Sequence, residues 1–137
     1  MSLSSLSFSF DKPNLLKAAP IPLIVVVVWS LLVALGLNLG VLTGIVTLLV
    51  WIFCGAWYVR TVLQSGSQPG VFNLALNGAL LGIVVSVVDD LVSWIGRNLR
   101  FGGVTLDLIS MLIGLIYVAL IVGMATVTWY AYQTEKR

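Results

Sequence analysis

The chain has 137 residues, of which 60% are hydrophobic and 9% are charged, and its mean hydropathy is +1.11. In soluble domains about a quarter of the residues are charged, so this composition predicts an integral membrane protein with room for roughly four spans of ~20 residues. The net charge of +2 comes from scattered Lys and Arg, which excludes a nucleic-acid footprint, and the lack of histidine beside a single cysteine argues against haem, zinc and dithiol chemistry.

Residues 1–20 are expected to form an N-terminal arm that lies at the membrane interface or docks on a partner. Between Ser5 and Phe10 polar and apolar side chains alternate, which is typical of a strand or an extended arm. A cleaved signal peptide is the alternative, because Lys12 and Lys17 precede an apolar run that ends in small residues.

The first two spans share one long uncharged segment. No charged residue occurs between Ile21 and Tyr58, which is too long for one helix across about 30 Å of hydrocarbon. The segment must fold back, and Asn38 with a glycine on each side marks the turn. We predict transmembrane helices over about 21–36 and 41–59.

A third helix is predicted after the Gly-, Ser- and Pro-containing loop of residues 60–70. A helix ending at Asp89 or Asp90 would place two negative charges at the negative end of its dipole. We therefore extend the helix over about 71–95, with Gly96 as its left-handed C-terminal cap.

The fourth helix is predicted over about 108–130, with Asp107 and Thr105 in position to cap its start. Residues 133–137 form a polar C-terminal tail. The fold class is thus all-α integral membrane, with four transmembrane helices within 21–132 arranged as two hairpins.

The distribution of positive charge predicts the orientation. An even number of spans places both termini and the middle loop on one face, which carries five cations against two on the other. This excess favours cytoplasmic termini in a bacterial-type plasma membrane. The two groups are Lys12, Lys17, Arg60, Lys136 and Arg137 on the first face, and Arg97 and Arg100 on the second. Aromatic residues near the predicted helix ends form a belt: Trp57, Tyr58, Trp94, Trp129, Tyr130 and Tyr132.

Small residues recur every four positions and are expected to form a helix-contact stripe. In lipid, close backbone approach at small residues supplies the van der Waals contact between helices. The spacing does not distinguish contacts within the chain from contacts with a partner. The two segments are Gly36, Gly40 and Gly44, and Gly78, Gly82 and Ser86. A weaker set on the fourth helix is Ser110 and Gly114, with Ala119 and Gly123 one face away.

Asp89 and Asp90, together with Arg97 and Arg100, form a candidate polar or ion-pair site. Asp90 lies one turn beyond Ser86, so it is expected to face a neighbouring helix, while Asp89 points about 100° away, toward the rim. Three interpretations stay open: the polar rim of a helix that reaches the interface, an ion pair with an arginine or a partner, and a transport site.

Polar and aromatic residues within the spans allow further alternatives. Asn73 and Asn77 lie one turn apart and form a candidate polar path, or else bond across to another helix. Trp29 and Trp51 would reach similar depth, where they pack on each other, contact lipid or flank an apolar cofactor. Tyr117 lies in the middle of the fourth span and needs a partner for its hydroxyl.

These features predict a non-enzymatic accessory or structural subunit of a larger membrane complex. The alternative is a small oligomeric channel or transporter with a polar path near Asp90, Asn73 and Asn77. The expected partners are the lipid bilayer and either other membrane subunits or further copies of the chain. We expect no catalytic residue, no metal, no cofactor and no nucleic acid.

Overall fold

In a computed structural model, which describes residues 10–66 and 68–136, the chain is all-helical over the described part, with five helices and no strand. The alternating segment from Ser5 falls outside the described residues except for Phe10. The helices are α1 (Lys12–Ala18), α2 (Pro20–Ala34), α3 (Val41–Ser65), α4 (Val71–Arg100) and α5 (Leu108–Lys136).

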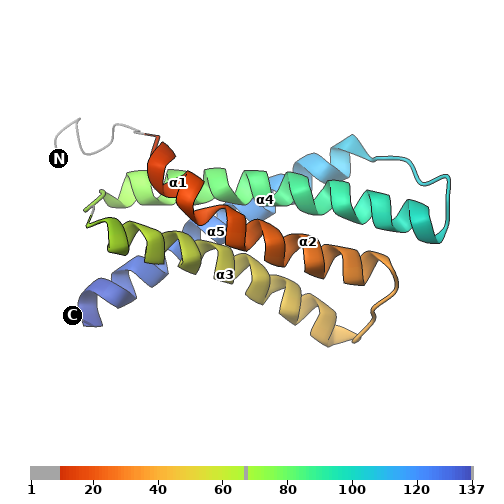
Figure 1. Cartoon of the computed structure of the whole chain (residues 1–137), viewed down its shortest axis with the longest axis horizontal. Coiled ribbons are helices and arrows are strands. Elements are labelled where there is room, and N and C mark those ends of the chain that lie inside the picture. The colour runs from red at the N-terminus through yellow and green to blue at the C-terminus, as the bar shows by residue number, and fades with distance from the viewer. Residues whose placement is uncertain (1–9, 67, 137) are drawn as a thin grey trace.

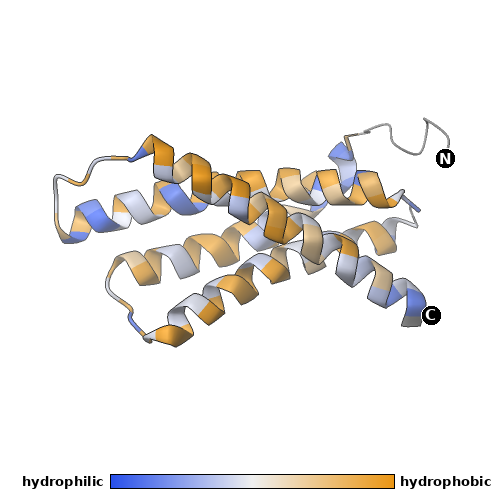
Figure 2. Ribbon diagram, turned by 180° about the vertical axis from the view of Figure 1, so that it is seen from behind, coloured by the Kyte–Doolittle hydropathy of each residue, from blue (hydrophilic) through white to orange (hydrophobic). Residues whose placement is uncertain are grey.

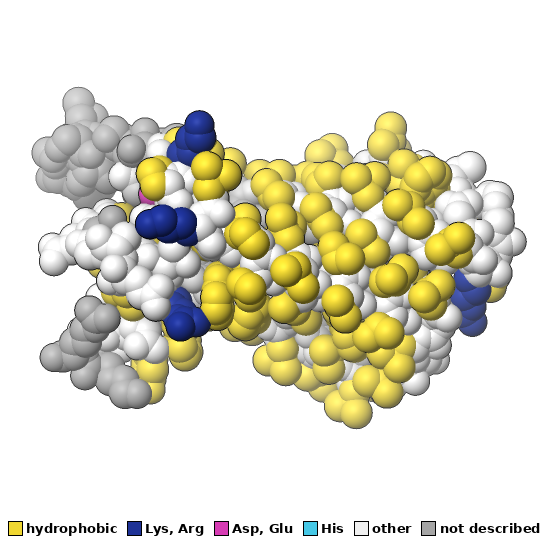
Figure 3. Space-filling view, in the orientation of Figure 1, with side chains coloured by type: hydrophobic (Ala, Val, Ile, Leu, Met, Phe, Trp, Pro, Cys, Tyr) yellow, Lys and Arg dark blue, Asp and Glu magenta, His cyan; other side chains and the backbone are white. Residues whose placement is uncertain are grey.

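The helices lie lengthwise, so that the molecule has two ends (Figure 1). The start of α1, the end of α5 and the connection between α3 and α4 share one end, which we call the termini end. The connections between α2 and α3 and between α4 and α5 lie at the opposite end. Hydrophobic side chains cover the middle of the surface in Figure 3, whereas Lys and Arg side chains appear toward the two ends. This distribution suits a bilayer.

Three helices, α3, α4 and α5, are long and apolar enough to cross a membrane. α1 and α2 meet the same test only as one segment, which is bent by 43°. The bend has a chemical cause, because Pro20 and Pro22 supply no N–H to the carbonyls one turn earlier. The sequence predicts a first span that starts near Ile21, whereas the helical turns begin earlier, at Lys12.

α4 continues past Asp89 and Asp90, as the dipole argument predicts, and ends at Arg100. The expectation that Gly96 caps this helix is wrong. Gly96 is buried inside α4, where an added Cβ would lie 2.6 Å from the Cβ of Ala34 on α2. Its small size serves close approach of two helices, while Gly102 and Gly103, with φ of 76° and 68°, turn the chain after the helix.

α5 begins with the predicted cap. The Asp107 carboxylate accepts hydrogen bonds from the backbone N–H groups of Ile109 and Ser110, at 3.1 and 3.2 Å, and from the Ser110 hydroxyl at 2.9 Å. The bonds from the Ser110 backbone and hydroxyl and from the Ile109 backbone hold the pKa of the Asp107 carboxyl below its usual value. This cap lies outside the membrane-spanning segments and fixes where α5 starts.

α5 crosses the bundle diagonally and packs against both α4 and α3 (Figures 1 and 2). Glycines allow the neighbouring helices to approach each other closely at these crossings. An added Cβ at Gly82 would lie 3.0 Å from the backbone of Ala119, and one at Gly55 would lie 3.0 Å from the carbonyl oxygen of Val122. The buried core draws on all five helices, and Tyr58 of α3 is among its largest fully buried side chains.

Candidate functional site

A buried polar network at the termini end joins α1, α3 and α4. The Asp11 carboxylate accepts hydrogen bonds from the Asn14 side-chain amide, at 2.9 Å, and from the Tyr58 hydroxyl, at 3.0 Å. The backbone N–H of Asp11 donates to Oδ1 of Asn77 at 2.9 Å. The start of α1 is thereby fixed on the bundle at two points, Tyr58 of α3 and Asn77 of α4.

The side chains of this network are buried, so their hydrogen bonds matter for the stability of the fold. The exposed fractions of Tyr58, Asn77 and Asn14 are 0%, 2% and 5%. A hydrogen bond to a charged group contributes about 1.5–3 kcal/mol, and an unpaired buried polar group carries a desolvation penalty of similar size. The network therefore stabilises one position of the N-terminal helix. Asp11 was not singled out from the sequence, because its partners lie 47 and 66 residues away along the chain.

The candidate path residues occupy different surroundings. Asn77 accepts from Asp11, and its amide donates to the Asn73 carbonyl at 2.8 Å, so both ends of its side chain are hydrogen-bonded. Asp90 lies thirteen residues further along α4, which is ~20 Å at helical rise. Between them, the polar side chains on α4 are Ser86 and, directly before Asp90, Asp89. The described structure does not bring Asp90 together with Asn73 and Asn77.

The aspartate pair lies on the half of α4 nearer the opposite end. The Ser30 hydroxyl of α2 donates a hydrogen bond to Oδ1 of Asp89. The expectation that Asp89 turns away from neighbouring helices is therefore wrong. Asp89 lies seven residues after Gly82, which places it within about 20° of that glycine around the helix. α4 meets α5 at Gly78 and Gly82 and meets α2 further along the same face, at Asp89 and Gly96.

The candidate ion-pair residues share the same region. Arg97 acts electrostatically on both Asp89 and Asp90, while its Nε donates to the Ser93 carbonyl at 3.3 Å. The guanidinium carbon of Arg100 lies 4.7 Å from the centroid of the Phe101 ring. Arg97 is thus the arginine placed to balance the carboxylates.

The helix-contact stripe divides into two kinds of position. On α4, an added Cβ at Gly78 would lie 2.8 Å from the Cβ of Thr126 on α5, and Ser86 is buried. Near the first turn, a Cβ at Gly36 would lie 3.1 Å from the Arg100 guanidinium. Among the described residues, a Cβ at Gly40 or Gly44 would meet nothing within 4 Å, so these two glycines make no close helix contact within the described part of the chain, and contact with a partner stays the open alternative.

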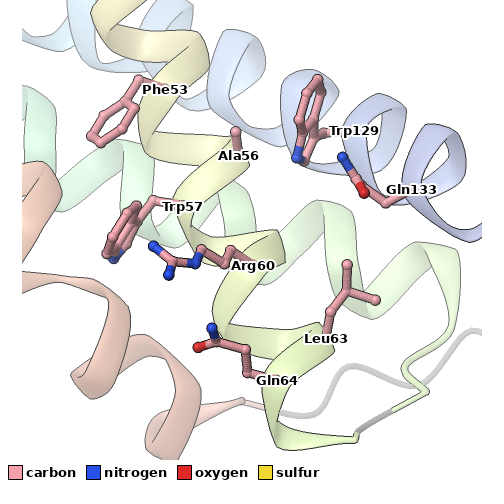
Figure 4. A pocket seen from close by; sticks show the side chains of 8 residues that line it. All are labelled: Phe53, Ala56, Trp57, Arg60, Leu63, Gln64, Trp129 and Gln133. Atoms are coloured by element: carbon pink, nitrogen blue, oxygen red, sulfur yellow. The ribbon is translucent and has the colours of Figure 1, made fainter.

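A cavity of about 450 Å³ lies between α3 and α5 toward the termini end (Figure 4). The Arg60 guanidinium carbon lies 4.6 Å from the centroid of the Trp57 ring. The sequence predicts Trp57 and Trp129 in the aromatic belt, but it does not indicate that they share a cavity with a cation. The lining residues are Phe53, Ala56, Trp57, Arg60, Leu63, Gln64, Trp129 and Gln133.

Chemically, these sites offer hydrogen bonds and charge. No group of three His, Cys, Asp or Glu side chains that could hold a metal ion forms within residues 10–66 and 68–136. Cys54 is fully buried in the core. Comparison of the chain with known proteins gives no matching family model, no matching curated protein and no matching solved structure.

Proposed function

We propose that the chain is a non-enzymatic accessory subunit of a larger membrane assembly. In this proposal the bent α1–α2 pair, α3, α4 and α5 each cross a bacterial-type plasma membrane once, with both termini cytoplasmic. The charge distribution supports the orientation, because Lys12, Lys17 and Arg60 lie on segments at the termini end and Arg97 and Arg100 near the opposite end.

The observation that carries the subunit proposal is the surroundings of Tyr117 on α5. Its side chain is 64% exposed, and it lies nine residues after Leu108, ~14 Å along the helix and close to the middle of the hydrocarbon core. In the described part of the chain its hydroxyl has no hydrogen-bond partner. A hydroxyl in hydrocarbon is costly without a partner, so a polar group from another chain would stabilise this position.

The neighbouring surface leaves room for another helix. An added Cβ at Gly114, one turn before Tyr117, would meet no atom of the described residues within 4 Å. On α3, Val41 is 83% exposed and Gly44 is likewise open to close approach. Small residues beside a polar side chain are typical of helix contacts in membranes.

Site-specific cross-linking tests this proposal. A photoreactive amino acid at position 117 should give a discrete adduct with a different membrane protein in intact cells. The matched control is position 84, because Val84 is also an exposed apolar residue, on α4. Adducts with lipid alone at both positions, or homo-oligomers alone after purification in mild detergent, would contradict the accessory role.

A further inference from the structure

The cavity between α3 and α5 at the termini end and its apolar continuation along α5 form one groove. We propose that this groove binds one anionic phospholipid. The Arg60 guanidinium would hold the phosphate, and an acyl chain would lie along the apolar continuation of the groove toward the middle of the bundle.

The polar end of the groove has the chemistry for a phosphate. Its lining includes Arg60, Gln64 and Gln133 and no acidic residue. The Trp57 ring holds the Arg60 guanidinium at 4.6 Å, which limits the positions of an otherwise exposed side chain. Guanidinium groups bind phosphate oxygens through paired N–H donors. Figure 4 shows the nitrogen atoms of Trp129 and Gln133 on the side of α5 nearer to α3.

The groove continues into apolar surroundings. A second cavity of about 330 Å³ shares Trp129 with the first, and its lining is mainly apolar. From Gln133 to Ile121 the distance along α5 is ~18 Å, directed toward the middle of the helix. A polar pocket that leads into an apolar groove matches a headgroup and its acyl chain, whereas a free phosphate would use only the polar end. The second cavity is lined by Ile52, Ile121, Met124, Ala125, Thr128 and Trp129.

The depth of the groove agrees with this occupant. Arg60 lies five residues, ~7.5 Å, before the end of α3 at Ser65, the level at which headgroups meet hydrocarbon. Tryptophan side chains favour the same level. A third cavity shares Trp57 and Gln64 with the first and is lined by Lys17, which adds a second cation beside the site. Basic pockets between transmembrane helices are typical sites for anionic headgroups.

Native mass spectrometry of the full chain in mild detergent tests the proposal, with phosphatidylglycerol and phosphatidylcholine of identical acyl chains as probes. We expect phosphatidylglycerol to be retained about fivefold better, since one cation near the surface contributes roughly that factor. Arg60→Gln should remove most of this preference, and the remainder is due to Lys17 beside the site. The matched control is Arg100→Gln, which removes the same charge near the opposite end and should leave the preference unchanged.

A second variant separates the acyl chain from the headgroup. Thr128→Phe fills the apolar part of the groove and should weaken retention of both lipids by a similar factor, independently of whether Arg60→Gln folds. Equal retention of the two lipids by the unaltered chain would overturn the proposal. So would equal behaviour of the two arginine variants, or displacement of bound lipid by glycerol phosphate at the lipid's own concentration, which would indicate a site for a free anion.

Discussion

Gly78 is the position where a single methyl group should have the largest effect on this fold. An added Cβ would lie 2.8 Å from the Cβ of Thr126 and closer still to its Oγ1. Thr126 is completely buried, and its hydroxyl donates to the Val122 carbonyl at 2.7 Å, so the side chain has little freedom to move. Gly78→Ala should therefore push α4 and α5 apart.

The magnitude follows from two opposing contributions. Overpacking in a tight core costs about 1–3 kcal/mol, and replacing a helical glycine with alanine stabilises the helix by about 1 kcal/mol. Gly114→Ala gains the second contribution without the first, because a Cβ there meets no atom within 4 Å. The free energies of unfolding of the two variants should therefore differ by about 1–3 kcal/mol, with Gly78→Ala the less stable.

Reversible unfolding in mixed micelles, followed by circular dichroism, measures this difference. Thr126→Gly removes the side chain that an alanine at position 78 would meet, so the double variant should recover part of the loss beyond additivity. Equal stability of Gly78→Ala and Gly114→Ala, or strict additivity in the double variant, would refute close packing of α4 on α5 as the reason for this glycine.

Three further changes test the polar contacts. Tyr58→Phe removes a donor to Asp11 and should lower the free energy of unfolding by about 1.5–3 kcal/mol; a change below about 0.5 kcal/mol in the same assay would contradict the network. Ser30→Ala leaves Asp89 without its α2 donor and should destabilise the chain by about 1–3 kcal/mol, whereas equal stability would show that the bond has no net effect. The lowered pKa of Asp107 means that its cap is fully effective above the usual aspartate value near 4 and is lost as pH falls through the lower folded-state value. Hydrogen exchange in the first turn of α5 should therefore rise in acid for the natural chain but stay independent of pH in Asp107→Asn, after correction for intrinsic exchange rates; parallel behaviour of the two would contradict this cap.

The local features of the fold could be predicted from the sequence because each depends on adjacent residues. The glycines around Asn38 predict the turn between α2 and α3, and the dipole argument predicts that α4 continues past its two aspartates. Asp107 is recognisable as a cap because its bonds reach only two and three residues ahead. In each of these cases the physical cause lies within one turn of the chain.

The features that depend on tertiary contacts could not be predicted in this way. A four-residue period drifts by about 40° per step around a helix. It therefore does not indicate that Asp89, seven residues after Gly82, shares that glycine's face and meets α2, or that Gly96 is buried against Ala34. Asp11 is an isolated carboxylate in the sequence, and only the packing of α1 on α3 makes it the centre of a network. Helix periodicity carries no information about which helix lies alongside.

The proline bend has a consequence for the bilayer itself. α2 contains 15 residues, ~22 Å of helix, while α4 contains 30 residues, ~45 Å. In the proposed topology a hydrocarbon core of about 30 Å is thicker than α2 alone is long, so α1 completes that crossing at 43° to α2, whereas α4 is longer than the core. A difference between helix length and hydrocarbon thickness is accommodated by local thinning of the bilayer and by helix tilt. In that topology a lipid beside α4 meets one straight helix that is longer than the core, whereas a lipid beside the bent pair meets two short helices that cross the same core in different directions.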